Sequence, residues 1–155
     1  MIWIIILLVL IVIVEGLIIT KFVKRELHQV YIPFNTDYKD KGYITIDCSC
    51  SGKTLCFIID TGCSRTSITG EALKGVSYKK CRRKTEAFGV VGDRYELILR
   101  SINITIAQQD FEVFCYEMKT ITSNLAPDIA GLLGTDFFDK YNWIIDYKHE
   151  RIIIK

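Results

Sequence analysis

An unbroken apolar run opens the chain. Residues 2–14 are all Ile, Leu, Val or Trp, and after Glu15 and Gly16 three further apolar residues extend the run to residue 19. A run of about 18 residues is just long enough to cross a bilayer as a helix. It begins without a charged side chain, and no Ala-x-Ala cleavage site follows it. The pattern therefore predicts a retained transmembrane helix over residues 1–21, with residues 2–19 in the lipid, rather than a signal peptide.

The residues that flank this run predict its orientation. Lys21, Lys24 and Arg25 follow the run and no basic residue precedes it, which favours a single-pass protein whose remaining residues are cytoplasmic. Glu15 is the one charged residue inside the run. We expect its carboxylate to reach the headgroups, with a contact between two such helices as the alternative.

The pattern then becomes mixed and changes to that of strands. Residues 22–41 are largely polar and predict a juxtamembrane tether, with a short pairing strand near residues 30–34. From residue 42 onward, short apolar or alternating stretches are separated by turn residues, which is typical of β-strands. The strands are expected at residues 43–50, 54–60, 67–69, 85–91, 94–107, 111–118, 129–133, 143–147 and 151–154.

Helical periodicity is scarce in the same region. One helical turn is expected near residues 72–73, and a short helix is expected at residues 136–141 with Thr135 as its cap. Many short strands at this spacing predict an all-β fold. We therefore expect a closed, barrel-like domain over residues 42–155 with one short C-terminal helix.

Charge argues against a nucleic-acid partner. The chain has 20 Lys and Arg against 18 Asp and Glu, and a net charge of +2. The small excess belongs to the residues that flank the apolar run, so the domain itself offers no basic footprint. The densest basic run is Lys-Lys-Cys-Arg-Arg-Lys at residues 79–84. We interpret it as a solvated loop, with contact to an anionic lipid surface as the alternative.

The cysteines predict neither disulfides nor a metal site. There are six, an even number, but a cytoplasmic domain favours free thiols. No Cys-x-x-Cys occurs, and the two histidines lie far from any cysteine in sequence, so no metal or other cofactor is expected. Cys48 and Cys50 are two residues apart in a predicted strand, which places both on one face and indicates packing.

One motif carries chemistry. The stretch Phe-Ile-Ile-Asp-Thr-Gly-Cys-Ser at residues 57–64 delivers Asp60 at the end of an apolar strand, on a tight turn through Thr61 and Gly62. Alone, Asp-Thr-Gly is a weak signal, because a strand-ending Asp often only accepts turn hydrogen bonds. About 70 residues later an apolar strand breaks at glycine in Ile-Ala-Gly-Leu-Leu-Gly-Thr-Asp-Phe-Phe, residues 129–138, and Trp-Ile-Ile-Asp-Tyr follows before a closing hairpin.

This order resembles the retropepsin-like aspartic peptidases, the single-domain relatives of pepsin, over nearly all of residues 42–155. The resemblance implies a dimeric peptidase with a catalytic aspartate at Asp60. It also implies that Thr61 joins interlocked hydrogen bonds between two such loops, and that Gly62 permits their close approach. Cys63 and Ser64 complete the active-site loop and depart from the usual family residues.

Paired carboxylates need a second copy of this chain. Hydrolysis of a peptide bond by two carboxyl groups requires one ionised group and one protonated group. The sequence holds a single Asp-Thr-Gly; Asp146 precedes Tyr-Lys, and Asp136 lies in Gly-Thr-Asp. We therefore expect a homodimer with its active site between two Asp60 residues on the twofold axis.

The remaining site residues are expected to surround a polypeptide substrate. Residues 87–93 contain two glycines among apolar residues, the composition of a mobile hairpin tip, and predict a flap over the cleft, with an ordinary hairpin as the alternative. The flap and pocket candidates are Phe88, Gly89, Val90, Val91, Gly92, Leu132, Leu133 and Gly134.

The two departures in the loop weaken parts of the resemblance. The thiol of Cys63 donates hydrogen bonds weakly, so it should stabilise an ionised carboxyl pair less than a serine would. Packing is the favoured role for Cys63, and a redox-sensitive site is the alternative. Ser64 stands where retroviral enzymes often carry an acidic residue that contacts the substrate backbone. Serine has no carboxylate, so we do not expect Ser64 to bind substrate as that acidic residue does.

The function that follows is a membrane-anchored, homodimeric aspartic endopeptidase. The alternatives are a catalytically silent retropepsin-like module for dimerisation or peptide binding, and a small membrane-associated scaffold. The intact Asp60-Thr61-Gly62 favours the peptidase, because a binding module has no chemical need of it.

Overall fold

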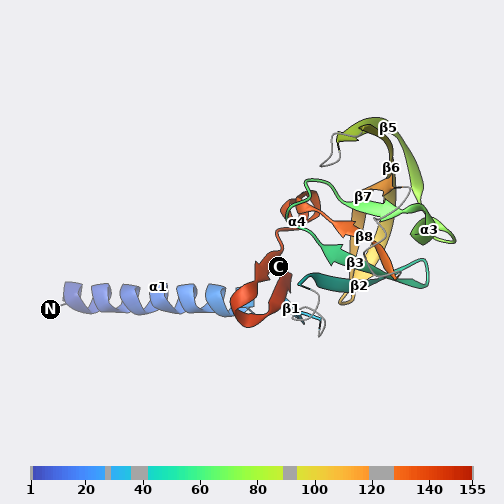
Figure 1. Cartoon of the computed structure of the whole chain (residues 1–155). Helices are drawn as coiled ribbons and strands as arrows, with labels where there is room; N and C mark the ends of the chain where they lie inside the picture. Colours follow the sequence, from blue (N-terminus) through green and yellow to red (C-terminus); the bar gives the residue numbers. More distant parts are fainter. Residues whose placement is uncertain (1, 27–28, 36–41, 89–93, 119–127, 155) are drawn as a thin grey trace.

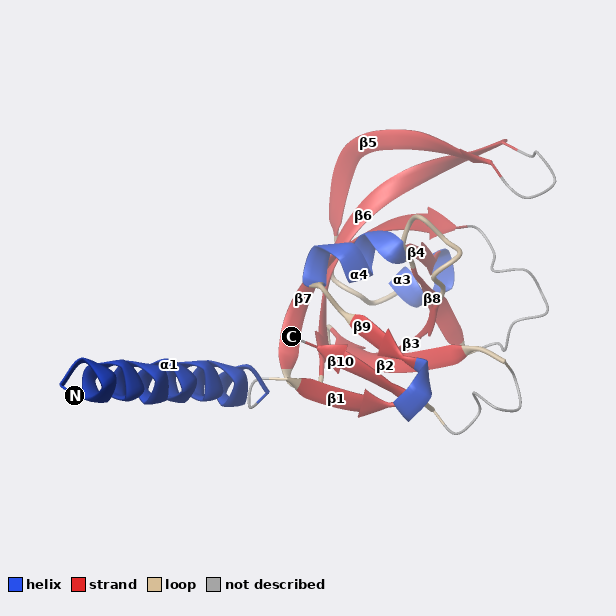
Figure 2. Ribbon diagram, turned by 90° about the vertical axis from the view of Figure 1, so that its left-hand side faces the viewer, coloured by secondary structure: helices blue, strands red, loops and turns tan. Residues whose placement is uncertain are grey.

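A long helix and a β-rich domain make up the computed structural model, which describes residues 2–26, 29–35, 42–88, 94–118 and 128–154 (Figure 1). The helix α1 spans Ile2–Glu26 and projects away from the domain in both views (Figures 1 and 2). The domain holds two sheets, one of seven strands and one of three.

The seven-stranded sheet closes into a barrel. Its order is β2-β3-β8-β4-β7-β6-β5, and β2 also pairs with β6, which joins the two ends of the ring and leaves β5 outside it. The bounds are β2 Ile44–Cys50, β3 Lys53–Ile59, β4 Ser67–Thr69, β5 Lys79–Phe88, β6 Arg94–Ile106, β7 Gln109–Met118 and β8 Ile129–Leu133. The all-β barrel expected from the strand spacing is thus confirmed.

Alternation along the strands builds the barrel core. In β2 every second residue is buried, including Cys48 and Cys50, and Phe111, Val113 and Cys115 alternate in the same way along β7. Burial raises the pKa of the Cys48 thiol to about 12 and that of Cys115 to about 12, so both stay protonated at neutral pH. The packing role predicted for Cys48 and Cys50 is confirmed.

The three-stranded sheet joins the start of the domain to its end. Its order is β1-β10-β9, with β1 at Val30–Pro33, β9 at Ile144–Asp146 and β10 at Arg151–Ile154. The short 3-10 helix η1, Tyr147–His149, links β9 to β10. The short strand expected near residues 30–34 is confirmed, and its antiparallel register pairs Val30 with Ile154.

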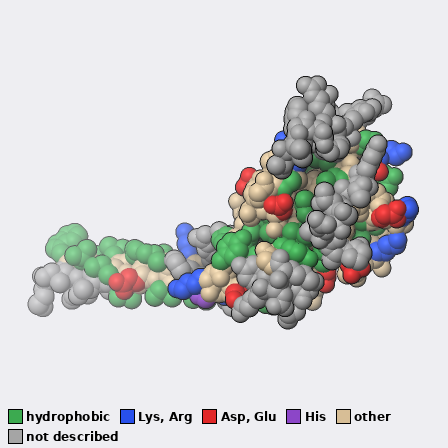
Figure 3. Space-filling view, in the orientation of Figure 1, with side chains coloured by type: hydrophobic (Ala, Val, Ile, Leu, Met, Phe, Trp, Pro, Cys, Tyr) green, Lys and Arg blue, Asp and Glu red, His purple; other side chains and the backbone are tan. Residues whose placement is uncertain are grey.

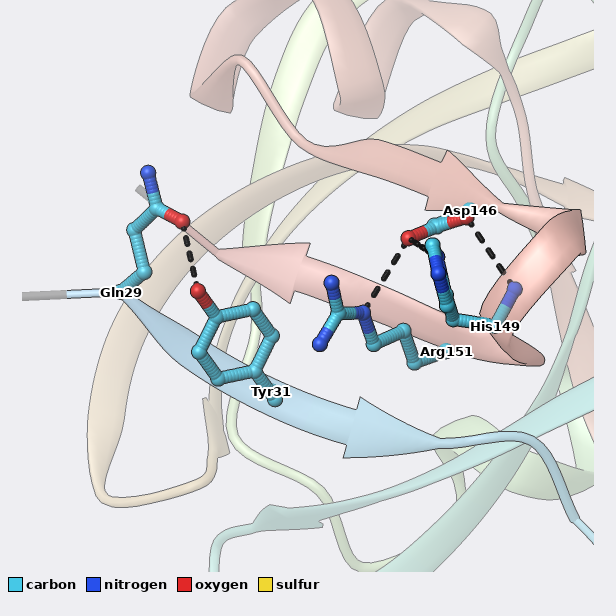
Figure 4. A network of polar contacts seen from close by, with 5 residues as sticks. All are labelled: Gln29, Tyr31, Asp146, His149 and Arg151. Atoms are coloured by element: carbon cyan, nitrogen blue, oxygen red, sulfur yellow. Dashed lines mark hydrogen bonds and ion pairs between the residues drawn. The ribbon is translucent and has the colours of Figure 1, made fainter. Parts of the chain in front are cut away.

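A polar network fixes this sheet (Figure 4). One Asp146 oxygen lies 2.7 Å from His149 Nδ1 and accepts from Arg151 Nε at 3.1 Å, and the other accepts from the His149 N–H at 3.2 Å. Burial alone raises the pKa of Asp146, but the hydrogen bonds from His149 and Arg151 outweigh it and leave that pKa below its ordinary value. The Arg151 guanidinium also lies 4.4 Å from the centre of the Tyr31 ring, which ties β10 to β1.

The C-terminal helix is present, but its cap differs from the prediction. Helix α4 spans Thr135–Tyr141, so Gly134 is the residue before the helix and Thr135 is its first residue; the predicted Thr135 cap is wrong. Gly134 stands there because the chain is crowded: a Cβ on it would lie 2.6 Å from the carbonyl carbon of Arg65. The single turn expected at residues 72–73 is α3, Gly70–Leu73, which Thr69 caps through the Ala72 N–H.

Aromatic side chains hold α4 against the barrel. Phe137 lies 5.8 Å from Phe111 on β7 and 4.9 Å from Trp143, ring centre to ring centre, in edge-to-face geometry. Phe111 also contacts Tyr141 at 4.9 Å and Trp143 at 5.3 Å. Such pairs add stabilisation beyond the area that they bury, so the helix has a fixed position on the outside of the barrel.

The basic run lies in a strand, and its interpretation as a loop is wrong. Lys79, Lys80 and Lys84 pair with β6 opposite Ser101, Arg100 and Ile98, with an irregularity between Lys80 and Lys84. Lysine has a low intrinsic propensity for strands, but pairing with the adjacent strand β6 outweighs that propensity here. A lysine-rich edge strand also resists pairing with other chains. Figure 2 shows the β5–β6 hairpin projecting beyond the barrel.

Helix α1 exposes an apolar surface. It is 25 residues long, and its described large apolar side chains, from Trp3 to Val23, are exposed along its length (Figure 3). Counted over the described residues alone, no helix is both long and apolar enough to cross a membrane. The side chains of Ile4, Ile5, Leu8 and Val9 lie outside the described set.

Replacing Gly131 by alanine is expected to destabilise the barrel. A Cβ there would lie 2.1 Å from the Ser67 carbonyl oxygen and 2.9 Å from Phe57 Cε1, both in rigid strands. Overpacking of this kind lowers the free energy of unfolding by about 3 kcal/mol. Urea denaturation followed by the fluorescence of buried Trp143 measures the loss. The control is Gly70→Ala, whose Cβ would meet its nearest atom at 3.6 Å; equal stability of the two variants would contradict the strand packing.

Candidate active site

Two parallel strands deliver Asp60. Strand β3 runs parallel to β8, with Ile58 opposite Leu132 and Ile59 opposite Leu133. The Asp60 N–H donates to the Leu133 carbonyl at 3.0 Å and continues this pairing by one residue. The carboxylate is therefore held at the carboxyl end of two buried strands, where it remains half-buried rather than free in solvent.

The turn after Asp60 orients its side chain. The Gly62 N–H donates to Asp60 Oδ1 at 2.9 Å, and the Cys63 N–H donates to the Asp60 carbonyl at 3.2 Å. A Cβ on Gly62 would lie 3.2 Å from the same carboxylate oxygen, tighter than most real contacts. Glycine at this position thus allows the amide to approach the carboxylate closely. The close approach of two loops at Gly62 concerns a second copy and stays a prediction.

A clamp from the far end of the chain holds the loop. Asp136 Oδ1 accepts from the Thr66 N–H at 2.8 Å and from the Thr66 hydroxyl at 2.7 Å, and that hydroxyl accepts from the Gly134 N–H at 3.1 Å. The Thr135 N–H also donates to the Cys63 carbonyl at 2.9 Å. Residues 63–66 and 134–136 are therefore one unit, although about 70 residues separate them. We name this unit the Thr66–Asp136 clamp.

An apolar cavity opens beside Asp60. It has a volume of about 380 Å³, and most of its wall is aliphatic or aromatic. Among the described residues, no basic side chain lines it, and Asp60 is the one carboxylate that does. Its lining residues are Gly42, Tyr43, Ile44, Ile58, Ile59, Asp60, Thr61, Leu132 and Tyr147. The cavity is suited to an apolar side chain held next to a carboxylate.

Tyr147 is a wall residue that the sequence did not suggest. It lies in η1, is 57% exposed, and its ring contacts Phe34 edge-to-face with the ring centres 5.8 Å apart. The Asp146, His149 and Arg151 network fixes the turn that carries it (Figure 4). No sequence signal connects this hairpin to the Asp60 loop, because the contact arises only when the two sheets pack.

The predicted site residues separate into three groups. Asp60, Thr61 and Leu132 line the cavity, whereas Leu133 is fully buried in the core and Gly134 belongs to the clamp. Phe88 ends β5, and the other flap candidates, residues 89–92, lie outside the described residues. The interlocked role of Thr61 concerns a second copy and stays a prediction.

Cys63 and Ser64 take different positions in the loop. The Cys63 thiol is half-buried and donates to the Arg65 carbonyl at 3.0 Å, which is a packing arrangement within the loop. Ser64 is exposed and does not line the cavity of Asp60. Two residues that complete the site were missed: Thr66, and Asp136 in the role of an acceptor. Within the part of the chain that the structure describes, no three His, Cys, Asp or Glu side chains are grouped to hold a metal ion.

A closed barrel that carries an Asp-Thr-Gly loop at the end of two parallel strands has a retropepsin-like fold. The structure is similar to the retroviral protease-like domain of Ddi1 from Leishmania major, with a TM-score of 0.57 at 14% identity over 73% of this chain and 88% of that one. It is also similar to a retropepsin-like aspartic protease from Rickettsia conorii, with a TM-score of 0.52 at 17% identity over 81% and 89%.

A retroviral enzyme matches over a smaller share of the chain. EIAV protease in complex with the inhibitor HBY-793 gives a TM-score of 0.50 at 16% identity over 64% of this chain and 88% of that one. No family model and no curated protein matches the sequence. At identities this low, structural similarity shows the fold alone. The retropepsin-like β-barrel expected from the sequence is confirmed at that level.

Replacing Thr66 by valine is expected to loosen the loop. Valine keeps the shape of this buried residue but removes the hydroxyl that donates to Asp136 and accepts from Gly134. Loss of a buried hydrogen bond to a charged group lowers the free energy of unfolding by about 3 kcal/mol. Chemical denaturation of wild type and Thr66→Val measures this loss in the free energy of unfolding. Thr105→Val is the matched control, because that hydroxyl donates to exposed Asp110; if both variants lose the same stability, the clamp does not hold the loop.

Proposed function

We propose that this protein is an aspartic endopeptidase that works as a homodimer. The observation that carries the proposal is the Asp60 carboxylate, held by the Gly62 N–H and facing an apolar cavity within a retropepsin-like barrel. One of the similar solved structures is named as a retropepsin-like aspartic protease and another as a retroviral protease, which supports the same chemical class for this chain.

The proposed mechanism uses one Asp60 from each copy. Two carboxyl groups close together share a proton, because both cannot ionise readily. The ionised Asp60 takes a proton from a water molecule as that water attacks the carbonyl carbon, and the protonated Asp60 donates its proton to the carbonyl oxygen. Collapse of the tetrahedral intermediate breaks the C–N bond, and the leaving nitrogen takes a proton from the carboxyl pair.

The proposal of a second copy is supported by the absence of a second carboxylate beside Asp60 among the described residues. Within the part of the chain that the structure describes, Asp60 is the single carboxylate of its cavity, and Thr61 beside it is exposed, so one loop presents half of a carboxyl pair. A twofold axis beside Thr61 would bring two Asp60 side chains together and would cover the open side of the cavity. Dimerisation and catalysis are therefore parts of one proposal.

We further propose that α1 anchors the protein in a bilayer with the domain on the cytoplasmic side. The support is the apolar run of residues 2–19, the exposed apolar side chains of α1 and the three basic residues after the run. Leaving such a helix in water is costly, because transfer of each aliphatic side chain from water into an apolar environment lowers the free energy by about 2 kcal/mol. Confinement to a membrane also raises the effective concentration of the partner copy.

Asp60→Asn is expected to abolish cleavage in the full-length protein. The amide cannot take a proton from water or share one, so the peptidase rate falls at least about a thousandfold. Cleavage of a mixed peptide library across pH 4 to 8, with and without a statine-type inhibitor, measures it. Asp139→Asn, an exposed carboxylate on α4, is the control and retains activity.

The same experiment separates the alternatives. Equal activity of wild type and Asp60→Asn would refute the carboxyl pair. If the wild-type protein is folded and dimeric by sedimentation yet cuts no peptide in the library, a silent peptide-binding or dimerisation module replaces the peptidase as the conclusion.

The anchor has its own test in vesicle flotation. The full-length protein is expected to float with lipid vesicles, and Leu10→Lys combined with Ile13→Lys to stay at the bottom of the gradient, because each lysine costs about 3 kcal/mol in the bilayer centre. Leu10→Ala combined with Ile13→Ala is the matched control and floats. A full-length protein that stays in the aqueous fraction would rule out the anchor.

A further inference from the structure

Residues of the Thr66–Asp136 clamp line a second cavity. Its volume is about 340 Å³, and it shares no lining residue with the cavity of Asp60. The loop, β6, β7 and α4 form its wall, and charged groups of both signs line it together with aromatic rings. Its charged residues are Arg65, Glu112, Asp136 and Lys140.

Three of these four charges are already engaged within the fold. Asp136 accepts two hydrogen bonds from Thr66 through Oδ1. Glu112 accepts from the Ser101 hydroxyl at 3.0 Å, and its other oxygen lies 3.9 Å from Lys140 Nζ. Lys140 also donates to the Glu112 carbonyl at 2.9 Å, and lies 4.9 Å from the centre of the Phe114 ring.

Arg65 is the charge that the fold does not use. Its side chain is exposed, and among the described residues its guanidinium makes no hydrogen bond or ion pair. Its backbone is nevertheless fixed, since its carbonyl accepts from the Cys63 thiol at 3.0 Å and Gly134 packs against it. A free cation thus stands on a rigid loop, five residues after the proposed catalytic Asp60.

The geometry points to a carboxylate side chain of the peptide substrate as the ligand of Arg65. A guanidinium presents a planar fork of N–H donors that matches a carboxylate in a bidentate arrangement. Asp60 and Arg65 belong to one loop, in which the Cys63 N–H donates to the Asp60 carbonyl and the Cys63 thiol donates to the Arg65 carbonyl. In the proposed arrangement an extended peptide, which advances about 3.3 Å per residue, runs from the cavity of Asp60 along this loop to Arg65. We propose that the enzyme selects an apolar residue at the scissile bond and an Asp or Glu at a neighbouring subsite on Arg65.

This inference rests on the proposed function, and its test uses the full-length protein. Peptides that carry Glu, Gln or Lys, scanned through each position around one apolar cleavage site, are offered to wild type, Arg65→Glu and Lys79→Glu. Lys79 is exposed on β5 and outside both cavities, so its variant makes the same change in net charge.

The expected result is a preference confined to one position. Wild type and Lys79→Glu should cleave the Glu peptide about tenfold or more faster in kcat/KM than its Gln analogue, the range of a charge-assisted pair. Arg65→Glu should lose that preference and favour the Lys peptide instead. Cleavage by wild type without any preference for Glu would overturn the inference, as would an unchanged preference in Arg65→Glu.

Binding to Asp60→Asn separates this inference from the peptidase proposal. If wild type cleaves nothing, but the Asp60→Asn protein binds the Glu peptide more tightly than the Gln peptide and Arg65→Glu removes the difference, the carboxylate site stands and the peptidase does not. If Arg65→Glu instead dissociates the dimer in sedimentation while wild type shows no preference for Glu, Arg65 contacts the second copy and the inference is overturned.

Discussion

The hydrogen bonds from Thr66 to Asp136 are the interaction on which the rest of the site depends. They join the Asp60 loop to the start of α4 across about 70 residues of chain, and the Thr66 side chain is almost fully buried. The Asp136 carboxylate is half-buried, and a carboxylate withdrawn from water needs donors, because leaving it unpaired is costly. The same requirement that stabilises the clamp therefore also holds the loop that carries both Asp60 and Arg65.

A second constraint concerns the cavity of Asp60, in which Asp60 is the one carboxylate among the described residues. The open wall of this cavity includes Tyr147, whose turn is held by Asp146 and Arg151, and the same small sheet contains β1, the strand that follows α1. The chain that emerges from the proposed anchor thus pairs with the hairpin that helps to wall the cavity. The Arg151 guanidinium over the Tyr31 ring adds a side-chain contact to this pairing.

Local pattern in the sequence predicted most strands and the position of Asp60, because alternation and a strand-ending Asp-Thr-Gly are local properties. The sequence pattern gave wrong predictions where contacts with residues far away in the chain determine the local structure. The basic residues of β5 are in a strand because β6 pairs with them, and Thr135 does not cap α4 because Gly134 must fit against Arg65. Thr66 and Tyr147 carried no signal, since each acquires its role from a partner far away in the chain.

The free guanidinium of Arg65 is easier to explain by recognition than by stability. An exposed ion pair with a neighbouring carboxylate contributes at most about 1 kcal/mol, and Arg65 makes no such pair among the described residues. A peptide lying over the second cavity would exclude water there, and the attraction between opposite charges grows as the effective dielectric constant falls. Arg65 then acts strongly only while substrate is bound, which favours discrimination between substrates without any contribution to the folding of the empty protein.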